Sequence, residues 1–202
     1  MRADSVVFDV GNVLIQWDAR RLFRKLVADP AQIEPILQRI GFSEWNLEQD
    51  RGRSYAEGVA LLSARHPEHA HLIRAYDERW QETVPGVVDG SIEILERLRG
   101  QNVPLYAITN FSREKWADSL QRFPFLAQFR DVVVSAHERL VKPDAAIYQL
   151  FLSRNGLQAG QCVFVDDSLP NILAAQAVGM RGVHFTGAEA LAGELRELGF
   201  AV

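Results

Sequence analysis

The residues of this chain that can take part in chemistry stand at or soon after the ends of short apolar runs. They comprise carboxylates, a hydroxyl, an amide and an ammonium, namely Asp9, Thr109, Asn110, Lys142, Asp166 and Asp167. Taken singly, an Asp, Thr or Asn after a strand is usually a turn or capping residue. Two adjacent carboxylates are harder to explain in that way, because they repel each other unless a cation or hydrogen-bond donors compensate. The combination predicts one polar site for a cation and an anionic substrate.

These groups fit phosphoryl transfer assisted by a divalent metal. The Asp9 carboxylate can attack phosphorus and form an acyl phosphate, which splits one difficult step into two. Lys142 supplies one positive charge, and Mg²⁺ held by Asp9 and Asp167 supplies more. Thr109 and nearby backbone amides can hold the remaining phosphate oxygens. No GxxxxGK[ST] motif is present, which argues against a P-loop mechanism.

The elements that must position these residues follow an alternating pattern. Five apolar runs predict strands buried on both faces, at residues 5–8, 104–108, 132–134, 162–165 and 182–185. Helical patterns lie between them, with Ser112 and Asp144 as caps and Pro170 in a first turn. The alternation predicts an α/β fold with a doubly wound, Rossmann-like parallel sheet. Ligands bind at the carboxyl ends of the strands in such sheets, so the polar residues are expected to meet in one crevice.

Residues 17–83 interrupt the alternation with helical patterns and no convincing strand. Four apolar stripes are visible, formed by Leu22, Phe23 and Leu26, by Ile33, Ile36, Leu37 and Ile40, by Val59, Leu61 and Leu62, and by Leu72, Ile73, Tyr76 and Trp80. We therefore predict a catalytic core of residues 1–16 and 84–202 with a helical insert at 17–83. Trp17 lies where core passes into insert and is favoured over Trp45, Trp80 and Trp116 to face the site.

Composition narrows the class of protein. The chain has 202 residues and a formal net charge of −4, which argues against a nucleic-acid binder, because such proteins normally need a basic surface. The single cysteine, Cys162, excludes an internal disulfide and a zinc site built on two cysteines of this chain. No run approaches the roughly 18 apolar residues of a membrane span. We expect a cytoplasmic protein without nucleic-acid or membrane partners, and the sequence leaves its oligomeric state open.

Four motifs in order give the chain a family resemblance. They are Phe8-Asp9-Val10-Gly11-Asn12-Val13-Leu14, Ile108-Thr109-Asn110, Lys142-Pro143-Asp144, and Val165-Asp166-Asp167 followed by Asn171. Over essentially its whole length the chain resembles the haloacid dehalogenase-like (HAD) hydrolase superfamily. The insert resembles the family's four-helix cap, which closes over the site and selects small substrates. The first and fourth motifs look most like the branch that includes alpha-glucose-1-phosphate phosphatase and the phosphatase domain of bifunctional epoxide hydrolases.

The resemblance implies a role for each motif residue. Asp9 would be the nucleophile and a metal ligand. Thr109 and Asn110 would contact phosphate, and Lys142 would stabilise the pentacovalent phosphorus. Two further residues would bind Mg²⁺, Asp167 through its carboxylate and Gly11 through its main-chain carbonyl. Asp166 would be a further ligand or would support the ligands from behind. The implied activity is hydrolysis of a small phosphorylated metabolite, with a sugar phosphate as the first candidate.

One position departs from the family pattern. Most family phosphatases carry a second Asp two residues after the nucleophile as general acid and base, and here that position is Gly11. Loss of a general acid typically costs about 10²–10⁴ in rate. One reading is a phosphatase whose leaving group needs little protonation, such as an anomeric sugar phosphate, or in which Asp18, Glu48 or Asp50 supplies the proton.

Two other readings stay open. A metal-independent 2-haloacid dehalogenase also lacks the second Asp, because halide leaves without a proton, but the acidic pair at 166–167 argues for Mg²⁺. A catalytically weak protein that only binds phosphorylated ligands would not need the nucleophile and Lys142 that this chain retains. The phosphatase is therefore the preferred interpretation.

Overall fold

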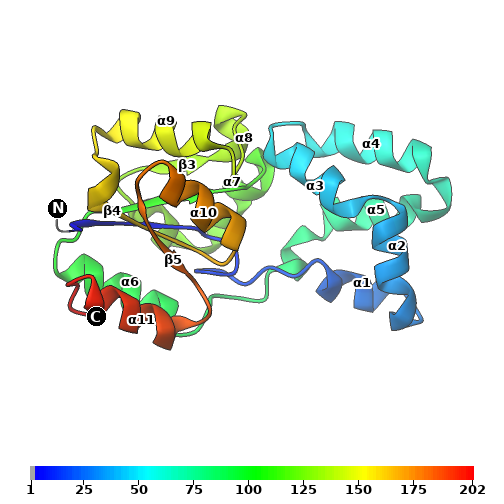
Figure 1. The fold of residues 1–202 in the computed structure, drawn as a ribbon. Coiled ribbons are helices and arrows are strands. Elements are labelled where there is room, and N and C mark those ends of the chain that lie inside the picture. The colour runs from blue at the N-terminus through cyan, green and yellow to red at the C-terminus, as the bar shows by residue number, and fades with distance from the viewer. Residues whose placement is uncertain (1–2) are drawn as a thin grey trace.

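A single parallel sheet forms the centre of the larger part of the molecule, whose computed structural model describes residues 3–202 (Figure 1). The strands are β1 (Ser5–Phe8), β2 (Leu105–Thr109), β3 (Val132–Val134), β4 (Cys162–Asp166) and β5 (Arg181–His184). Their order across the sheet is β3-β2-β1-β4-β5, and every pair is parallel. The predicted strands and α/β class are confirmed, with bounds that shift by one residue for β2, β4 and β5.

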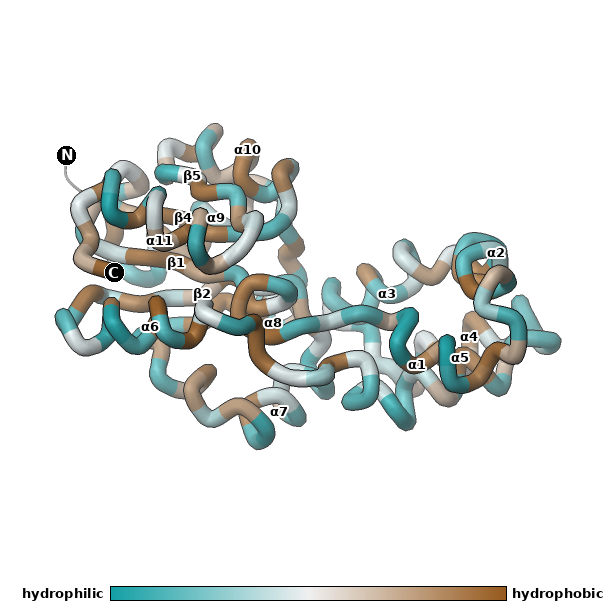
Figure 2. Tube along the Cα trace, turned by 90° about the horizontal axis from the view of Figure 1, so that it is seen from below, coloured by the Kyte–Doolittle hydropathy of each residue, from teal (hydrophilic) through white to brown (hydrophobic). Residues whose placement is uncertain are grey.

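Helices cover both faces of this sheet. They are α6 (Ser91–Gly100), α7 (Arg113–Arg122), α8 (Ser135–Glu138), α9 (Ala145–Asn155), α10 (Leu169–Ala177) and α11 (Ala188–Glu197). In Figure 1, α9 and α10 lie on one face and α6 and α11 on the other. The alternation of side chains along β1 serves both layers, because Val7 packs in the cluster with Ile147 and Phe151 while Phe8 packs with Leu98. Figure 2 shows the resulting apolar centre around β1 and β4.

The predicted helix starts are found where the sequence placed them. Ser112 caps α7 by accepting from the main-chain N–H of Lys115, and Asp144 caps α9 by accepting from that of Ala146. Pro170 lies in the first turn of α10, where its missing N–H costs nothing. These local signals hold because each of them satisfies backbone groups within a single turn of helix.

The insert between β1 and α6 contains helices and no strand of the sheet, and it lies beside the α/β part (Figure 1). It contains α1 (Arg20–Leu26), α2 (Ile33–Arg39), α3 (Phe42–Asp50), α4 (Tyr55–Arg65) and α5 (Ala70–Glu78), with short 3₁₀ turns at Pro30–Gln32, Pro67–His69 and Trp80–Thr83. The four predicted stripes correspond to α1, α2, α4 and α5. Helix α3 was not predicted, because its apolar residues do not gather on one face. We call residues 17–83 the cap; its boundaries at 16/17 and 83/84 stay a prediction.

The cap has its own aromatic core. Tyr76 of α5 is fully buried and lies with its ring centroid 4.8 Å from that of Phe42 and 5.8 Å from that of Trp45, both of α3. Such edge-to-face contacts stabilise beyond the area they bury. The cap also contacts the α/β part directly, since Lys115 Nζ of α7 lies 2.6 Å from Asp77 Oδ1 of α5. Among residues 3–202, no helix is long and apolar enough to cross a membrane.

Candidate active site

The order of the strands places the polar strand ends together. The chain runs from β1 outward to β2 and β3 on one side and to β4 and β5 on the other, so the connections diverge between β1 and β4. Asp9 follows β1, and its main-chain N–H donates to Val165 O of β4 at 2.8 Å. Asp166 ends β4, so the two carboxyl groups stand side by side at the place where such folds bind ligands.

A buried ammonium joins these two carboxylates. Lys142 Nζ lies 2.8 Å from Asp9 Oδ1 and 2.7 Å from Asp166 Oδ2, and all three residues are buried. Charged groups out of water are stable only when paired and hydrogen-bonded. The sequence predicts that Lys142 meets the carboxylates that follow β1 and β4. In the structure these three groups form one ion cluster.

The two members of the acidic pair have different surroundings. The carboxylate of Asp166 is engaged inward, where it accepts from Lys142 Nζ, from Asn171 Nδ2 at 3.0 and 3.1 Å, and from the Ser168 main-chain N–H at 2.8 Å. Asp167 is exposed and lines the cavity described below. Asp166 is the last residue of β4 and Asp167 is the first residue after it, so two neighbours in sequence have different surroundings here.

Negative charge exceeds positive charge in this cluster. Burial raises the pKa of Asp9 to about 7, and the charge of Asp166 adds to that rise while Lys142 opposes it. Burial, followed by the charge of Asp166, also raises the pKa of Asp167 above its usual value. Burial opposes the charge on Lys142, yet the attraction of Asp9 and Asp166 outweighs it and raises the pKa of the ammonium. A further cation would relieve this imbalance.

The second motif positions Lys142 through its amide. Asn110 Nδ2 donates to Lys142 O at 3.0 Å, and Asn110 Oδ1 accepts from the Lys142 main-chain N–H at 2.8 Å. The Asn110 side chain thus holds the Lys142 segment, an arrangement that sequence reasoning did not anticipate. Thr109 is buried at the end of β2, beside Val134 of β3, and does not line the cavity. Phosphate contacts by Thr109 and Asn110 stay predictions.

The loop after β1 turns sharply at Gly11 and Asn12. Asn12 has a φ of 55°, a left-handed conformation that Asn tolerates better than most residues. Its Oδ1 accepts from the Trp17 main-chain N–H at 2.9 Å, which fixes the start of the cap segment against the first motif. A Cβ placed on Gly11 would meet no atom within 4 Å. Gly11 therefore leaves open space beside Asp9 where the family pattern has a carboxylate.

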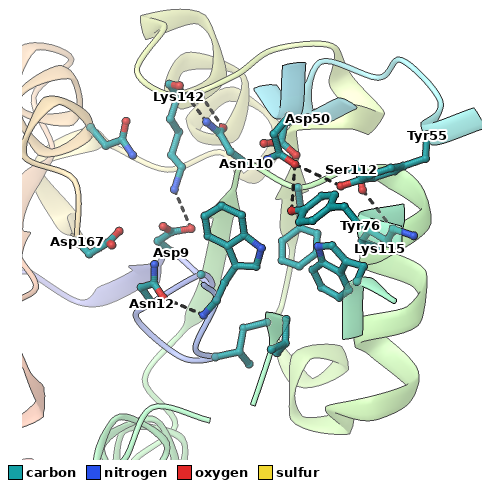
Figure 3. Close-up of a pocket in the computed structure, with 18 residues that line it drawn as sticks. Asp9, Asn12, Asp50, Tyr55, Tyr76, Asn110, Ser112, Lys115, Lys142 and Asp167 are labelled. Carbon is teal, nitrogen blue, oxygen red and sulfur yellow. Dashed lines mark hydrogen bonds and ion pairs between the residues drawn. The ribbon is translucent and has the colours of Figure 1, made fainter. Parts of the chain in front are cut away.

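A cavity of about 220 Å³ opens over Asp9 between the cap and the α/β part. Figure 3 shows Asp9, Asp167 and Lys142 on one side of it and Asp50, Tyr55 and Tyr76 on the other. Apolar side chains form much of the remaining wall, namely Ile15, Trp17, Trp80, Val84 and Phe111. Trp17 thus faces the site as predicted from its position in the chain.

The cap residues of the wall were largely missed by sequence reasoning. Asn46 and Asp50 come from α3, and Tyr55 and Tyr76 come from α4 and α5. Asn46 Oδ1 accepts from both phenols at 3.3 Å, which ties the three helices together. The sequence signal available for Asp50 was only its acidity within the insert, a property it shares with Asp18 and Glu48.

Curated relatives match this chain over part of their length. The sesquiterpene phosphatase astK of Aspergillus oryzae is 37% identical over 105 residues, which are 52% of this chain and 54% of that protein. A phosphoglycolate phosphatase of Pseudomonas fluorescens is 31% identical over 167 residues, which are 81% of this chain and 60% of that protein. The chain spans about half the length of the curated relatives it matches.

Solved structures share the fold. The HAD family enzyme bt-2542 of Bacteroides thetaiotaomicron superposes with a TM-score of 0.79 at 20% identity, covering 97% of this chain and 100% of that one. The model of the haloacid dehalogenase-like hydrolase family matches residues 6–185, a range that includes all four motifs and the insert. With the carboxylates after β1 and β4, the Lys142 ammonium between them and the cap above, this match shows that the chain belongs to the haloacid dehalogenase-like hydrolase family.

Proposed function

We propose that this protein is a Mg²⁺-dependent phosphatase that hydrolyses a small phosphorylated metabolite through an aspartyl-phosphate intermediate. The observation that carries the proposal is the Asp9 carboxylate, which borders a cavity and is paired with the buried Lys142 ammonium at 2.8 Å. Relatives named as sesquiterpene, phosphoglycolate and validoxylamine A 7'-phosphate phosphatases support the reaction class.

The chain's own residues divide the reaction into two displacements at phosphorus. First, an Asp9 oxygen attacks phosphorus and forms a bond to it while the bond to the leaving oxygen breaks. Then water attacks the same phosphorus and the bond to Asp9 breaks, which releases phosphate and restores the carboxylate. Lys142 stabilises the negative charge that develops on the phosphoryl oxygens. Its own position is held by Asp166 and Asn110, so it needs no rearrangement during the reaction.

The donor set fits a hard divalent cation. Ligand atoms of Asp9, Asp166 and Asp167 lie within 4.8 Å of one another, and carboxylate oxygens are the ligands that Mg²⁺ prefers. Because the Asp166 oxygens already accept several hydrogen bonds, we assign the direct contacts to Asp9, Asp167 and the main-chain carbonyl of Gly11. When bound, Mg²⁺ would supply the positive charge that lets an anionic nucleophile meet a phosphate dianion. The enzyme bt-2542 has been solved with magnesium and inorganic phosphate.

The size and the surface of the cavity indicate which kind of substrate fits it. A volume of about 220 Å³ suits a leaving group of one ring or a short chain, and its aromatic walls suit a molecule with an apolar face. The ring of a sugar phosphate has such a face, and so does the skeleton of an apolar alcohol. A sugar phosphate stays the first candidate, and a panel of both kinds of monophosphate tests it. The assignment to the sugar-phosphatase branch and the cytoplasmic location are further predictions of the same proposal.

The two alternatives fit the site less well. Among the described residues, the cluster contains three carboxylates and a single ammonium. A dehalogenase that works without a metal does not need this excess of carboxylates. A protein that only binds phosphorylated ligands does not need Asp9 placed against Lys142 at the floor of the cavity. Halide release from 2-haloacids without metal would reverse the order between phosphatase and dehalogenase, and tight ligand binding without turnover would favour the binding protein.

Removal of magnesium is expected to stop turnover. Because a catalytic metal contributes several kcal/mol of charge stabilisation, excess chelator should lower kcat for 4-nitrophenyl phosphate by roughly 10²-fold or more, and added Mg²⁺ should restore it. The Asp167→Asn variant should require more Mg²⁺ for half-maximal activity while its stability stays within about 0.5 kcal/mol, because Asp167 is exposed. Asp89→Asn is the matched control, an exposed Asp outside the cavity lining. Turnover that chelator does not affect would contradict the proposed metal dependence.

A further inference from the structure

The motif residues around Asp9 offer no free group that can protonate the leaving oxygen. Gly11 has no side chain, and Lys142 is committed to Asp9 and Asp166. In an in-line displacement, the leaving oxygen departs on the side of phosphorus opposite to the attacking Asp9 oxygen. With no side chain at Gly11, an acid for that oxygen can come from the cap wall of the cavity.

Asp50 is placed on that side. It is the last residue of α3 and lines the same cavity as Asp9, from the opposite wall (Figure 3). Asn46 lies one helical turn earlier on the same face and also lines the cavity, so this face of α3 is turned toward the site. Asp50 is partly buried, which places its carboxyl group at the wall without closing it off from the cavity.

Helix α3 is held firmly against its neighbours. Trp45 Nε1 donates to Gly58 O of α4 at 2.8 Å, and the fully buried Gln49 donates to Trp45 O at 2.5 Å. A Cβ on Gly58 would lie 2.6 Å from Gln49 Oε1, so a larger residue there would have to displace the buried Gln49 side chain. Just after Asp50, a Cβ on Gly52 would lie 3.0 Å from Ala136 O of α8. The end of α3 thus rests directly on the α/β part.

We propose that Asp50 is the general acid and base of this phosphatase and replaces, from the cap, the carboxylate that is absent at Gly11. This role rests on the proposed function. As Asp9 bonds to phosphorus, the Asp50 carboxyl group gives its proton to the leaving oxygen, which departs as an alcohol. The resulting Asp50 carboxylate then takes a proton from the water that attacks phosphorus. The bond to Asp9 breaks, phosphate leaves, and Asp50 is protonated again for the next cycle.

The surroundings of Asp50 suit a proton carrier near neutral pH. Burial raises the pKa of Asp50 to about 7; Lys142 across the cavity opposes the rise and the charge of Asp9 adds to it. Tyr55 and Tyr76 face it from α4 and α5, and burial raises the pKa of both phenols, which keeps them neutral. The remaining charged groups that line the cavity are Asp167 and Lys115. The Lys115 ammonium is paired with Asp77 at 2.6 Å and lies 4.5 Å from the centre of the Tyr55 ring.

The other two acids proposed from the sequence are turned to other tasks. Asp18 lies 3.4 Å from the Arg24 guanidinium and accepts from the Arg20 main-chain N–H, and Glu48 lies 2.7 Å from Arg51. Neither of these acids lines the cavity. Glu48 is two residues from Asp50 on the same helix, so Glu48→Gln serves as the matched control for Asp50→Asn.

The decisive test compares esters that differ in how much their leaving group needs a proton. In Asp50→Asn, kcat/KM for benzyl phosphate, an alkyl ester, should fall by about 10²–10⁴-fold, while 4-nitrophenyl phosphate should lose less than about tenfold. In the parent protein, kcat/KM for benzyl phosphate should fall as pH rises above about 7, because the protonated carboxyl is the active acid. That fall should be absent in Asp50→Asn, and Glu48→Gln should match the parent in both esters.

Two results would overturn the role of Asp50. One is an equal loss on both esters, which would indicate a binding or structural role, and the other is no loss on either. Thermal unfolding separates misfolding from lost chemistry, since Asp50→Asn removes a carboxylate that burial disfavours and is expected to melt no lower than the parent. If the parent protein hydrolyses neither ester with Mg²⁺, the proposed function itself fails. That result is measured on the parent protein alone, so it is distinguishable from a loss that is confined to the Asp50 variant.

Restoring the missing carboxylate gives an independent test. Because a Cβ at Gly11 meets no atom within 4 Å, the Gly11→Asp substitution is expected to fold normally. In the double variant Gly11→Asp/Asp50→Asn, benzyl phosphate turnover should recover at least about tenfold over Asp50→Asn, because the proton again has a carboxyl donor beside the leaving oxygen. Gly11→Asn in the same background is the control, since an amide has the same shape and no proton to give. If Gly11→Asn restored turnover as much as Gly11→Asp, the recovery would not need a proton donor, and this would contradict the acid role proposed for Asp50.

Discussion

The Asp9→Asn variant is expected to lose at least about 10⁴-fold in kcat/KM for 4-nitrophenyl phosphate while it retains the fold of the parent. An amide oxygen cannot form the acyl phosphate, but it can still accept the Val10 main-chain N–H that the carboxylate accepts at 2.7 Å. Lys142 keeps Asp166 as its partner at 2.7 Å, so no charge is stranded. Steady-state kinetics with saturating Mg²⁺ measure the loss, and circular dichroism checks the fold.

The nucleophile can also be identified without turnover numbers. Acid quenching of the parent during hydrolysis should trap a phosphoryl group on the peptide that contains Asp9, detectable by mass spectrometry. The trapped group should be absent from Asp9→Asn and from Asp9→Ala, which cannot revert by deamidation. Asp4→Asn is the matched control, because Asp4 is an exposed residue just before β1, at the end of the strand opposite Asp9. A phosphoryl group on any other residue would contradict the assignment of Asp9.

Replacing Lys142 by methionine is expected to cost both stability and activity. Methionine fills a similar volume but leaves the buried carboxylates of Asp9 and Asp166 without their ammonium partner. Breaking a buried ion pair by removing one partner typically costs about 3–5 kcal/mol of unfolding free energy. Urea unfolding measures this loss, and turnover of 4-nitrophenyl phosphate should fall below detection because the charge on the phosphoryl oxygens is no longer compensated.

The loss of stability should depend on pH in a defined direction. Without Lys142, the pKa of Asp9 in the folded protein rises further above its unfolded value, so the folded state binds more protons than the unfolded state between those two values. Stability then falls as pH rises through this range, and Lys142→Met should be less stable at pH 8 than at pH 6. Adding Asp9→Asn should recover part of the loss. If the loss of stability were the same at both pH values, and the same with and without Asp9→Asn, it would indicate a packing defect instead.

Much of the α/β part could be predicted from local sequence. The apolar runs of β1 and β4 are long enough for a strand and too short for a helix, and each ends at a carboxylate. Parallel strands share one edge for their carboxyl ends, so Asp9 and Asp166 had to be on the same side of the sheet. The apolar runs do not predict the strand order β3-β2-β1-β4-β5, which makes β1 and β4 neighbours. Strand order depends on contacts between segments that are distant in the chain.

The roles of individual polar side chains were harder to predict than their location. Asp166 and Asp167 are adjacent, yet one supports Lys142 from within and the other lines the cavity. The phosphate contact expected of Asn110 stays a prediction, and the sequence did not indicate that its side chain holds the main chain of Lys142. A residue type states which hydrogen bonds a group can make, and only the packed structure decides which partner is within reach.

Sequence alone therefore determined the motifs, the class of fold and the chemistry available at the strand ends, because strand and capping signals act within a few residues. It also showed the gap at Gly11. Only the tertiary structure decided which acid of the cap reaches the cavity over Asp9. Helix α3 has no apolar stripe to reveal it, and Asp50 reaches the cavity through the packing of Trp45 and Gln49 on α4. Such packing depends on the fit of surfaces brought together from across the chain, which no local pattern records.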